Sequence, residues 1–79
     1  LNSPFLRAQA EGVNRQPEIA ELLDSSERIT ALYRRILARQ PDSEELALAR
    51  RYLGDRPTER HWAAFAQVLL MSNEFYFCD

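Results

Sequence analysis

The segment from Ile29 to Leu46, ITALYRRILARQPDSEEL, most constrains what this chain can fold into. Large apolar residues recur in its first half at i, i+3, i+4, i+7 and i+8 and therefore share one face of a helix: Ile29, Leu32, Tyr33, Ile36 and Leu37. Pro41 ends this helix, and Asp42 with Glu45 three residues later predicts a capping box for the next one. Other elements must cover the apolar face, so the segment predicts a helical core.

The rest of the chain carries further helix starts and stops. Ser3 and Pro4 suit a first helix, Gly12 weakens it and Pro17 breaks it, while Asp24 is placed to cap the central helix. The predicted helices are about 4–11, 18–23, 25–39, 43–53 and 58–71. Gly54 suits the end of the fourth, and Ser72 with Asn73 is expected to end the last.

The pattern predicts an all-α fold, a small bundle of four to five short helices with an aromatic C-terminal tail. The two strongest apolar stripes are expected to pack against each other through Ile29, Leu32, Ile36, Trp62, Phe65 and Leu69. Seventy-nine residues allow one domain, 1–79, which buries only about 60% of the surface that the unfolded chain exposes. Because the chain begins with Leu1, we expect it to be a fragment of a larger protein.

The charged residues follow the helix ends. The net charge is −2, all ten basic residues are arginine, acids gather at the predicted helix starts and arginines at the ends. The helix dipole favours this distribution. A nucleic-acid or helix-turn-helix interpretation would use Arg34, Arg35, Arg39, Arg50 and Arg51. The acidic balance disfavours it, because duplex binding depends on neutralising phosphates.

No catalytic, cofactor or metal constellation is present in the sequence, so it predicts a non-enzymatic domain without a cofactor. His61 is the only histidine and is interpreted as a helix-start residue, since metal-ligand spacing is missing. Cys78, the single cysteine, excludes an internal disulfide. It is interpreted as a small buried residue, with pairing to another chain or segment as the alternative. Serines at cap positions are interpreted as caps: Ser25, Ser26, Ser43 and Ser72.

The tail residues Phe75, Tyr76 and Phe77 are the candidate interaction residues. Adjacent aromatic side chains leave the backbone in different directions, so they cannot all face one core. We expect Phe75 to turn inward and Tyr76 or Phe77 to present an apolar surface to a partner.

Three blocks resemble the C-terminal end of the planctomycete domain of unknown function 1553, the PSD-one domain. They are LNSPF at the start, LYRRIL through RQPDSEEL in the middle, and LLMSNEF with Asp79 at the end. The sequence departs from the family pattern at Ala38, where glycine is usual, at Met71 and at Cys78. A weaker likeness is to the helical repeats of bacterial surface proteins and phycobilisome-linker-like domains, which share LYR…PD…EL and S-x-E-F.

The resemblance implies a non-catalytic structural or interaction module that closes a larger exported, extracytoplasmic protein and docks on its remainder. Many family members also carry a cytochrome-c-like haem domain, although this segment has no haem motif. Weak self-association is a further expectation, whereas nucleic acid and membrane insertion are not expected. The alternatives are a portion of an enzyme whose catalytic residues lie upstream and, further behind, a DNA-binding helix-turn-helix.

Overall fold

The computed structural model describes the backbone of residues 3–77 and the side chains of residues 3–72. Within this part the chain is an all-α bundle of five helices without strands, as the sequence predicts. The helices are α1 (Pro4–Arg15), α2 (Pro17–Ala20), α3 (Ser25–Leu37), α4 (Ser43–Leu53) and α5 (Glu59–Phe77). Among the described residues, no helix combines the length and the apolar character needed to cross a membrane.

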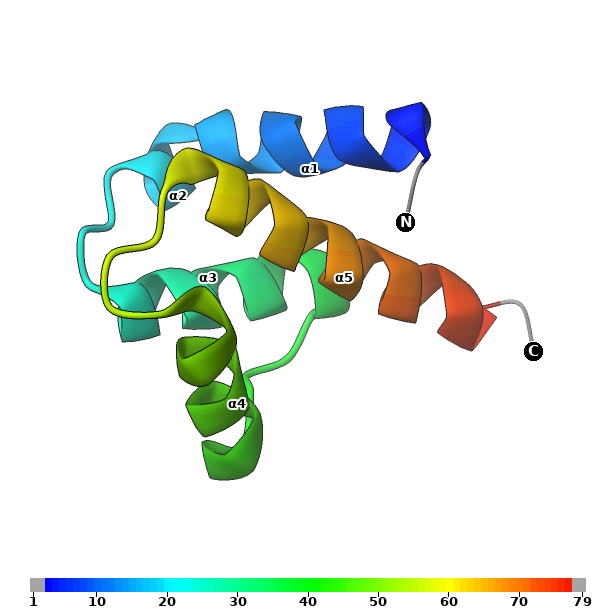
Figure 1. The fold of residues 1–79 in the computed structure, drawn as a ribbon. Coiled ribbons are helices and arrows are strands. Elements are labelled where there is room, and N and C mark those ends of the chain that lie inside the picture. The colour runs from blue at the N-terminus through cyan, green and yellow to red at the C-terminus, as the bar shows by residue number, and fades with distance from the viewer. Residues whose placement is uncertain (1–2, 78–79) are drawn as a thin grey trace.

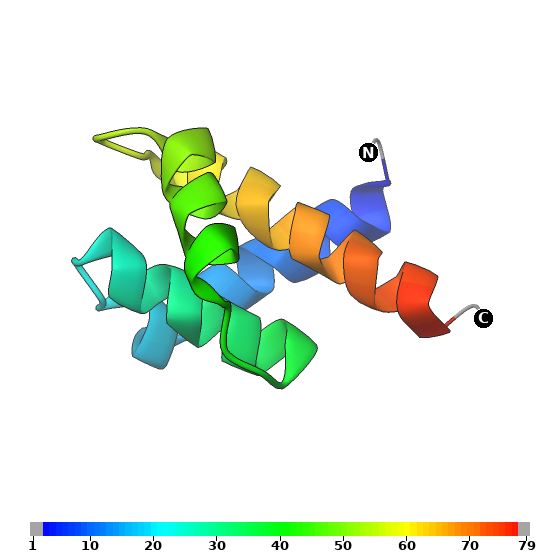
Figure 2. The same cartoon turned by 90° about the horizontal axis from the view of Figure 1, so that it is seen from below.

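Helix α5 is the centre of the arrangement. It contacts α1, α3 and α4, and it packs most extensively against α1, which runs in the opposite direction beside it (Figures 1 and 2). Helix α4 runs across α3, and its N-terminal end lies far from α1 (Figure 1). The C-terminal turns of α5 extend beyond the helices that flank it in both views. The bundle therefore covers the first part of α5 on several sides and leaves its end projecting.

The helix starts confirm the predicted caps. Ser3 Oγ accepts a hydrogen bond from the Leu6 amide at 3.2 Å, and Asp24 Oδ2 accepts one from the Glu27 amide at 3.0 Å. Asp42 and Glu45 form the complete capping box, with bonds of 2.8 and 3.0 Å in the two directions. These local bonds satisfy amides that have no partner inside the helix and so define where each helix begins.

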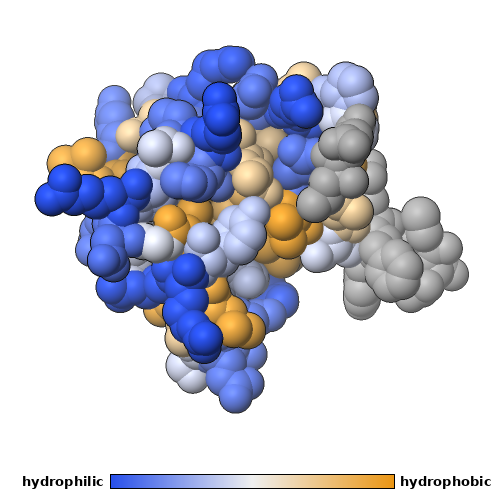
Figure 3. Space-filling view, in the orientation of Figure 1, coloured by the Kyte–Doolittle hydropathy of each residue, from blue (hydrophilic) through white to orange (hydrophobic). Residues whose placement is uncertain are grey.

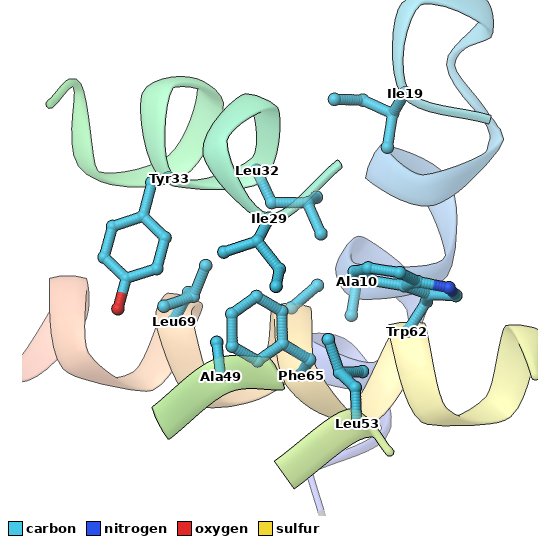
Figure 4. Packing of buried hydrophobic residues seen from close by; sticks show 11 residues of the cluster. Ala10, Ile19, Ile29, Leu32, Tyr33, Ala49, Leu53, Trp62, Phe65 and Leu69 are labelled. Carbon is cyan, nitrogen blue, oxygen red and sulfur yellow. The ribbon is translucent and has the colours of Figure 1, made fainter. Parts of the chain in front are cut away.

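The core is one cluster drawn from all five helices. The predicted contact between α3 and α5 is confirmed: Ile29, Leu32, Trp62, Phe65 and Leu69 are buried in the cluster, and Ile36 is half-buried against it. Figure 4 shows the Phe65 ring among side chains from α3 and α4. Ala10 and Ala66 are completely buried, and such small residues allow α1 and α5 to approach closely.

Two predicted helix ends are wrong. Helix α1 continues through Gly12 to Arg15, because packing against α5 offsets the cost of about 1 kcal/mol that glycine imposes inside a helix. Helix α5 continues through Ser72 and Asn73 to Phe77. Serine and asparagine are only weak helix formers, and neither proline nor glycine follows them, so nothing in this segment stops the helix.

Smaller differences occur at two other ends. Helix α2 is a single turn that starts at Pro17 itself and ends at Ala20, before the predicted end. Helix α3 ends at Leu37, two residues before the predicted limit near Arg39. Ala38 takes the left-handed conformation there, with φ 59° and ψ 31°. The stop at Gly54, with φ 82°, is confirmed.

Candidate functional site

An apolar hollow lies where α3, α4 and α5 meet, and we call it the aromatic hollow. Its volume is about 310 Å³. It is lined by Tyr33, Leu37, Arg39, Glu45, Leu48, Ala49, Tyr52, Phe65, Val68, Leu69 and Ser72. Apolar patches interrupt the largely hydrophilic face seen in Figure 3. The hollow joins exposed apolar side chains to the core beneath them.

The floor of the aromatic hollow is part of the core. The Phe65 ring lies 6.3 Å from the Tyr33 ring and 6.3 Å from the Tyr52 ring, both tilted, with Trp62 edge-on behind it. Such tilted and edge-on arrangements are the favoured ones for aromatic pairs. Phe65 and Tyr33 are buried, so the floor is held in place by packing on several sides.

The walls of the aromatic hollow are exposed apolar residues. Leu48 and Tyr52 lie one turn apart on α4 and are 62% and 57% exposed, and Val68 on α5 is 38% exposed. Met71, 39% exposed, comes three residues after Val68 on α5, beyond the lining of the hollow. Leu48 and Tyr52 stand outside the α4 stripe that faces the core, which consists of Leu46, Ala49 and Leu53.

A charged pair forms the rim. Two nitrogens of Arg39 bind the two carboxylate oxygens of Glu45 at 2.8 and 2.9 Å, and the guanidinium lies 5.5 Å from the centre of the Tyr33 ring. The hydrogen bond from Arg39, with that from the Asp42 amide, lowers the pKa of Glu45 from 4.5 to about 2. Burial and the Glu45 charge raise the pKa of the Tyr33 hydroxyl. The Glu45 carboxylate therefore balances the positive charge of Arg39 at the rim.

A second group of polar residues lies between α1, α3 and α5, with Arg28 and Asn14 buried and Glu59 exposed at its edge. Arg28, with a side chain only 5% exposed, donates to the Glu59 carboxylate at 3.0 and 3.3 Å and to Asn14 Oδ1 at 2.9 Å. Asn14 donates to the backbone carbonyls of Ala10 and Trp62 at 3.0 and 3.1 Å. The Arg28 Nε atom has no hydrogen-bond partner among the described residues. This cluster joins three helices.

The sequence prediction missed this buried cluster, although a signal was present. Arg28 comes one turn before Leu32 and so lies on the apolar face of the central helix. Asn14 comes one turn after Ala10 on the buried face of α1. Buried polar side chains need partners, so a polar residue on each of two apolar stripes indicates a contact between them.

The arginines that the disfavoured nucleic-acid interpretation would use form separate contacts. Arg39 pairs with Glu45, Arg35 Nε donates to Gln16 Oε1 at 3.2 Å, and Arg50 donates to Ser26 Oγ at 3.0 Å. Arg34 and Arg51 border two different hollows. These contacts tie neighbouring elements to one another.

His61 has the predicted helix-start role. Its Nδ1 accepts a hydrogen bond from the Thr58 amide at 3.0 Å, while Thr58 Oγ1 accepts one from the His61 amide at 3.3 Å. The imidazole accepts a hydrogen bond from the amide of the residue that precedes α5, as the Glu45 carboxylate does at the start of α4. As the acceptor, Nδ1 is the unprotonated ring nitrogen. This reciprocal pair fixes the start of α5.

The interpretation of the serines as caps is wrong. Asp24 and Asp42 occupy the cap positions, so Ser25 and Ser43 become the first residues of α3 and α4. Ser26 follows in the first turn of α3, and Ser72 lies inside α5. Each aspartate precedes its serine by one position, and its carboxylate accepts the hydrogen bond from the amide of Glu27 or Glu45 that a cap receives.

The predicted interaction residues Phe75, Tyr76 and Phe77 belong to α5, but their side chains lie outside the described residues, as does Cys78. Among the described residues, no group of three or more His, Cys, Asp or Glu side chains is placed to hold a metal ion. Comparison of the chain with protein-family models, with curated proteins and with solved structures finds no match.

Proposed function

We propose that this chain is a non-catalytic helical interaction module that docks on the rest of a larger protein through the aromatic hollow. The observation that carries the proposal is the gathering of Leu48, Tyr52 and Val68, all exposed, around an aromatic floor. Contiguous exposed apolar surface commonly marks a protein contact. Docking would remove this surface from water.

The composition of the aromatic hollow resembles that of a protein interface. Its centre is apolar and aromatic, while the Arg39–Glu45 pair and Ser72 supply a polar border. Interfaces commonly combine an apolar, aromatic-rich centre with a polar rim. The rigid floor means that little ordering would be needed before a partner binds, which favours affinity.

The dimensions favour a side chain of a protein partner over a free small molecule. The volume of about 310 Å³ is at the lower limit of small-molecule sites, and the Tyr52 and Leu48 walls are mostly exposed. One or two large apolar side chains from a facing helix would fill such a hollow. The partner would present leucine or aromatic residues.

The resemblance to the C-terminal end of the PSD-one domain supports the remainder of the same protein as this partner. On that basis the module would belong to an exported, extracytoplasmic protein, in some members associated with a haem domain. The projecting end of α5, which carries the predicted interaction residues 75–77, would extend the contact.

Hydroxyl-radical footprinting tests the proposal. The protein from its natural source is compared with the isolated 79-residue chain, and modification is measured at individual side chains. We expect Leu48, Tyr52, Val68 and Met71 to be protected in the natural protein and reactive in the isolated chain.

Two exposed apolar residues away from the hollow serve as internal controls. Phe5 on α1 is 64% exposed, and Leu23 before α3 is 96% exposed. Their reactivity should be the same in both samples. Equal reactivity of Leu48 and Tyr52 in the two samples would contradict docking through this surface.

A further inference from the structure

One row of residues on α5 begins at the aromatic hollow and continues past it. Val68 and Ser72 line the hollow, Met71 lies beside them, and all three are exposed. Position 75, a phenylalanine, completes the spacing i, i+3, i+4 and i+7, which places the four positions on one face of the helix. We call Val68, Met71, Ser72 and Phe75 the α5 stripe.

The α5 stripe extends beyond the helices that flank it. Helix α5 runs unbroken to Phe77, and its last turns project from the bundle in both views (Figures 1 and 2). A helix advances about 1.5 Å per residue, so position 75 lies about 10 Å beyond Val68 along the axis. The helix therefore carries this phenylalanine away from the hollow of its own chain. In an antiparallel neighbour, the same position comes level with Val68.

We infer that two copies of this chain pair through their α5 stripes, antiparallel about a two-fold axis between Met71 and Ser72. In this register, Phe75 of each copy lies opposite Val68 of the other copy and reaches its aromatic hollow, while Met71 lies opposite Ser72. The two copies present the same surface to each other, as in most homodimers. Each copy thus supplies the aromatic residue that covers the hollow of the other.

The composition of the α5 stripe suits this contact. None of its four residues carries a charge, so two copies with a net charge of −2 each can meet without burying a charged group. Ser72 lies next to the axis, where the helices come closest, and its small side chain permits the approach that Ala10 and Ala66 permit between α1 and α5. In the hollow, Phe65 offers an aromatic ring to the incoming Phe75.

The inference rests on the proposed function, because it takes the aromatic hollow as a contact surface, and it names a second copy as the molecule that covers this surface in the isolated chain. Each copy contributes little more than two turns of helix, so we expect a weak dimer with a dissociation constant of about 0.1–1 mM. At low micromolar concentration the chain is then monomeric and its hollow is open. In the natural protein, the remainder of the protein would displace the second copy.

Sedimentation velocity tests the pairing at chain concentrations from about 0.01 to about 1 mM. Cys78→Ser is the starting protein, which excludes a disulfide between copies. We expect its sedimentation coefficient to rise towards that of a dimer. Val68→Glu and Phe75→Lys should each weaken the dimer about tenfold or more, because each places an unpaired charge in an apolar contact. The double variant should regain much of the association, since the two opposite charges then face each other at both ends of the contact.

Leu23→Lys is the matched control, because Leu23 is 96% exposed in the segment before α3 and lies outside the α5 stripe. It makes the same change in charge as Phe75→Lys and should leave the dimer unaltered. A chain that stays monomeric up to about 1 mM would overturn the inference. So would a double variant that associates no better than the single ones. Neither result touches the proposed docking, which fails on a separate readout, equal footprinting of Leu48 and Tyr52 in the natural protein and the isolated chain.

Discussion

The guanidinium of Arg28 lies over the indole of Trp62, with its central carbon 4.7 Å from the ring centroid. The same guanidinium binds Glu59 and Asn14, so one side chain of α3 meets both α1 and α5. An arginine over the face of a tryptophan is attracted by the negative charge of the ring face. This contact closes the end of the core nearest the start of α5.

Replacing Arg28 should show how far the bundle depends on the buried cluster. We expect Arg28→Ala to lower the free energy of unfolding by about 2–3 kcal/mol, because Asn14 loses a buried partner and the aliphatic part of Arg28 loses its packing. Arg28→Met keeps most of the packing and should cost about 1–2 kcal/mol. Urea unfolding measures both, and equal stability of the wild type and the alanine variant would contradict a structural role.

Trp62 should be a principal core residue. It is only 4% exposed and contacts Phe65 edge-on as well as Arg28. Trp62→Ala should cost about 3–5 kcal/mol. A domain of this size holds only about 5 kcal/mol or slightly more, so the variant should be largely unfolded. A cooperative thermal transition of Trp62→Ala near that of the wild type would show that the ring contributes little to stability. Trp62→Phe keeps an aromatic ring and should retain a cooperative transition, at a lower temperature than that of the wild type.

The pair of Glu45 and Arg39 should make stability depend on pH in the acid range. The pKa of Glu45 is lowered from 4.5 to about 2 in the folded chain. The ionised Glu45 therefore contributes fully to the free energy of unfolding above about pH 4.5, and this contribution is lost as the pH falls towards 2. The pair is partly exposed, with side chains 52% and 31% accessible, so solvent screening keeps its contribution to the free energy of unfolding small.

Arg39→Gln isolates this effect. Its stability should fall below that of the wild type by a constant amount above about pH 5, and the two curves should converge at lower pH. Arg51→Gln provides a control with the same change in charge and no Glu45 contact. A difference between wild type and Arg39→Gln that is independent of pH would contradict the proposed cause.

The local features of the fold and the contact between α3 and α5 were predictable from the sequence, and the other nonlocal features were not. The caps at Ser3, Asp24 and Asp42 depend on bonds within three residues, which a sequence pattern contains. The persistence of α1 beyond Gly12 depends on α5, more than forty residues away in the chain. A prediction from helix propensity alone therefore places the end of α1 too early.

The aromatic hollow shows the same limit. The exposed pair Leu48 and Tyr52 could be recognised as lying off the core stripe of α4, but their meeting with Val68 depends on how α4 crosses α5.

His61 provides a test of the reciprocal cap at the start of α5. Glutamine is the usual alternative acceptor at this third position of a helix, so His61→Gln should retain the stability of the wild type. His61→Ala removes the acceptor of the Thr58 amide and should cost about 0.5–1 kcal/mol. If His61→Ala and His61→Gln unfold at the same urea concentration, the imidazole does not act as a cap.

Ala38 should be a site where glycine stabilises the chain. Its left-handed conformation, with φ 59°, ends α3 and costs an alanine about 1–2 kcal/mol relative to glycine. Glycine increases the entropy of the unfolded chain, which removes about 0.5–1 kcal/mol of that gain. Ala38→Gly should therefore raise the free energy of unfolding by about 0.5–1 kcal/mol. Gly54, at φ 82° after α4, provides the opposite test, since Gly54→Ala should destabilise the chain. Urea unfolding of the two variants decides the matter: a loss of stability in Ala38→Gly would show that the alanine is not strained at the end of α3.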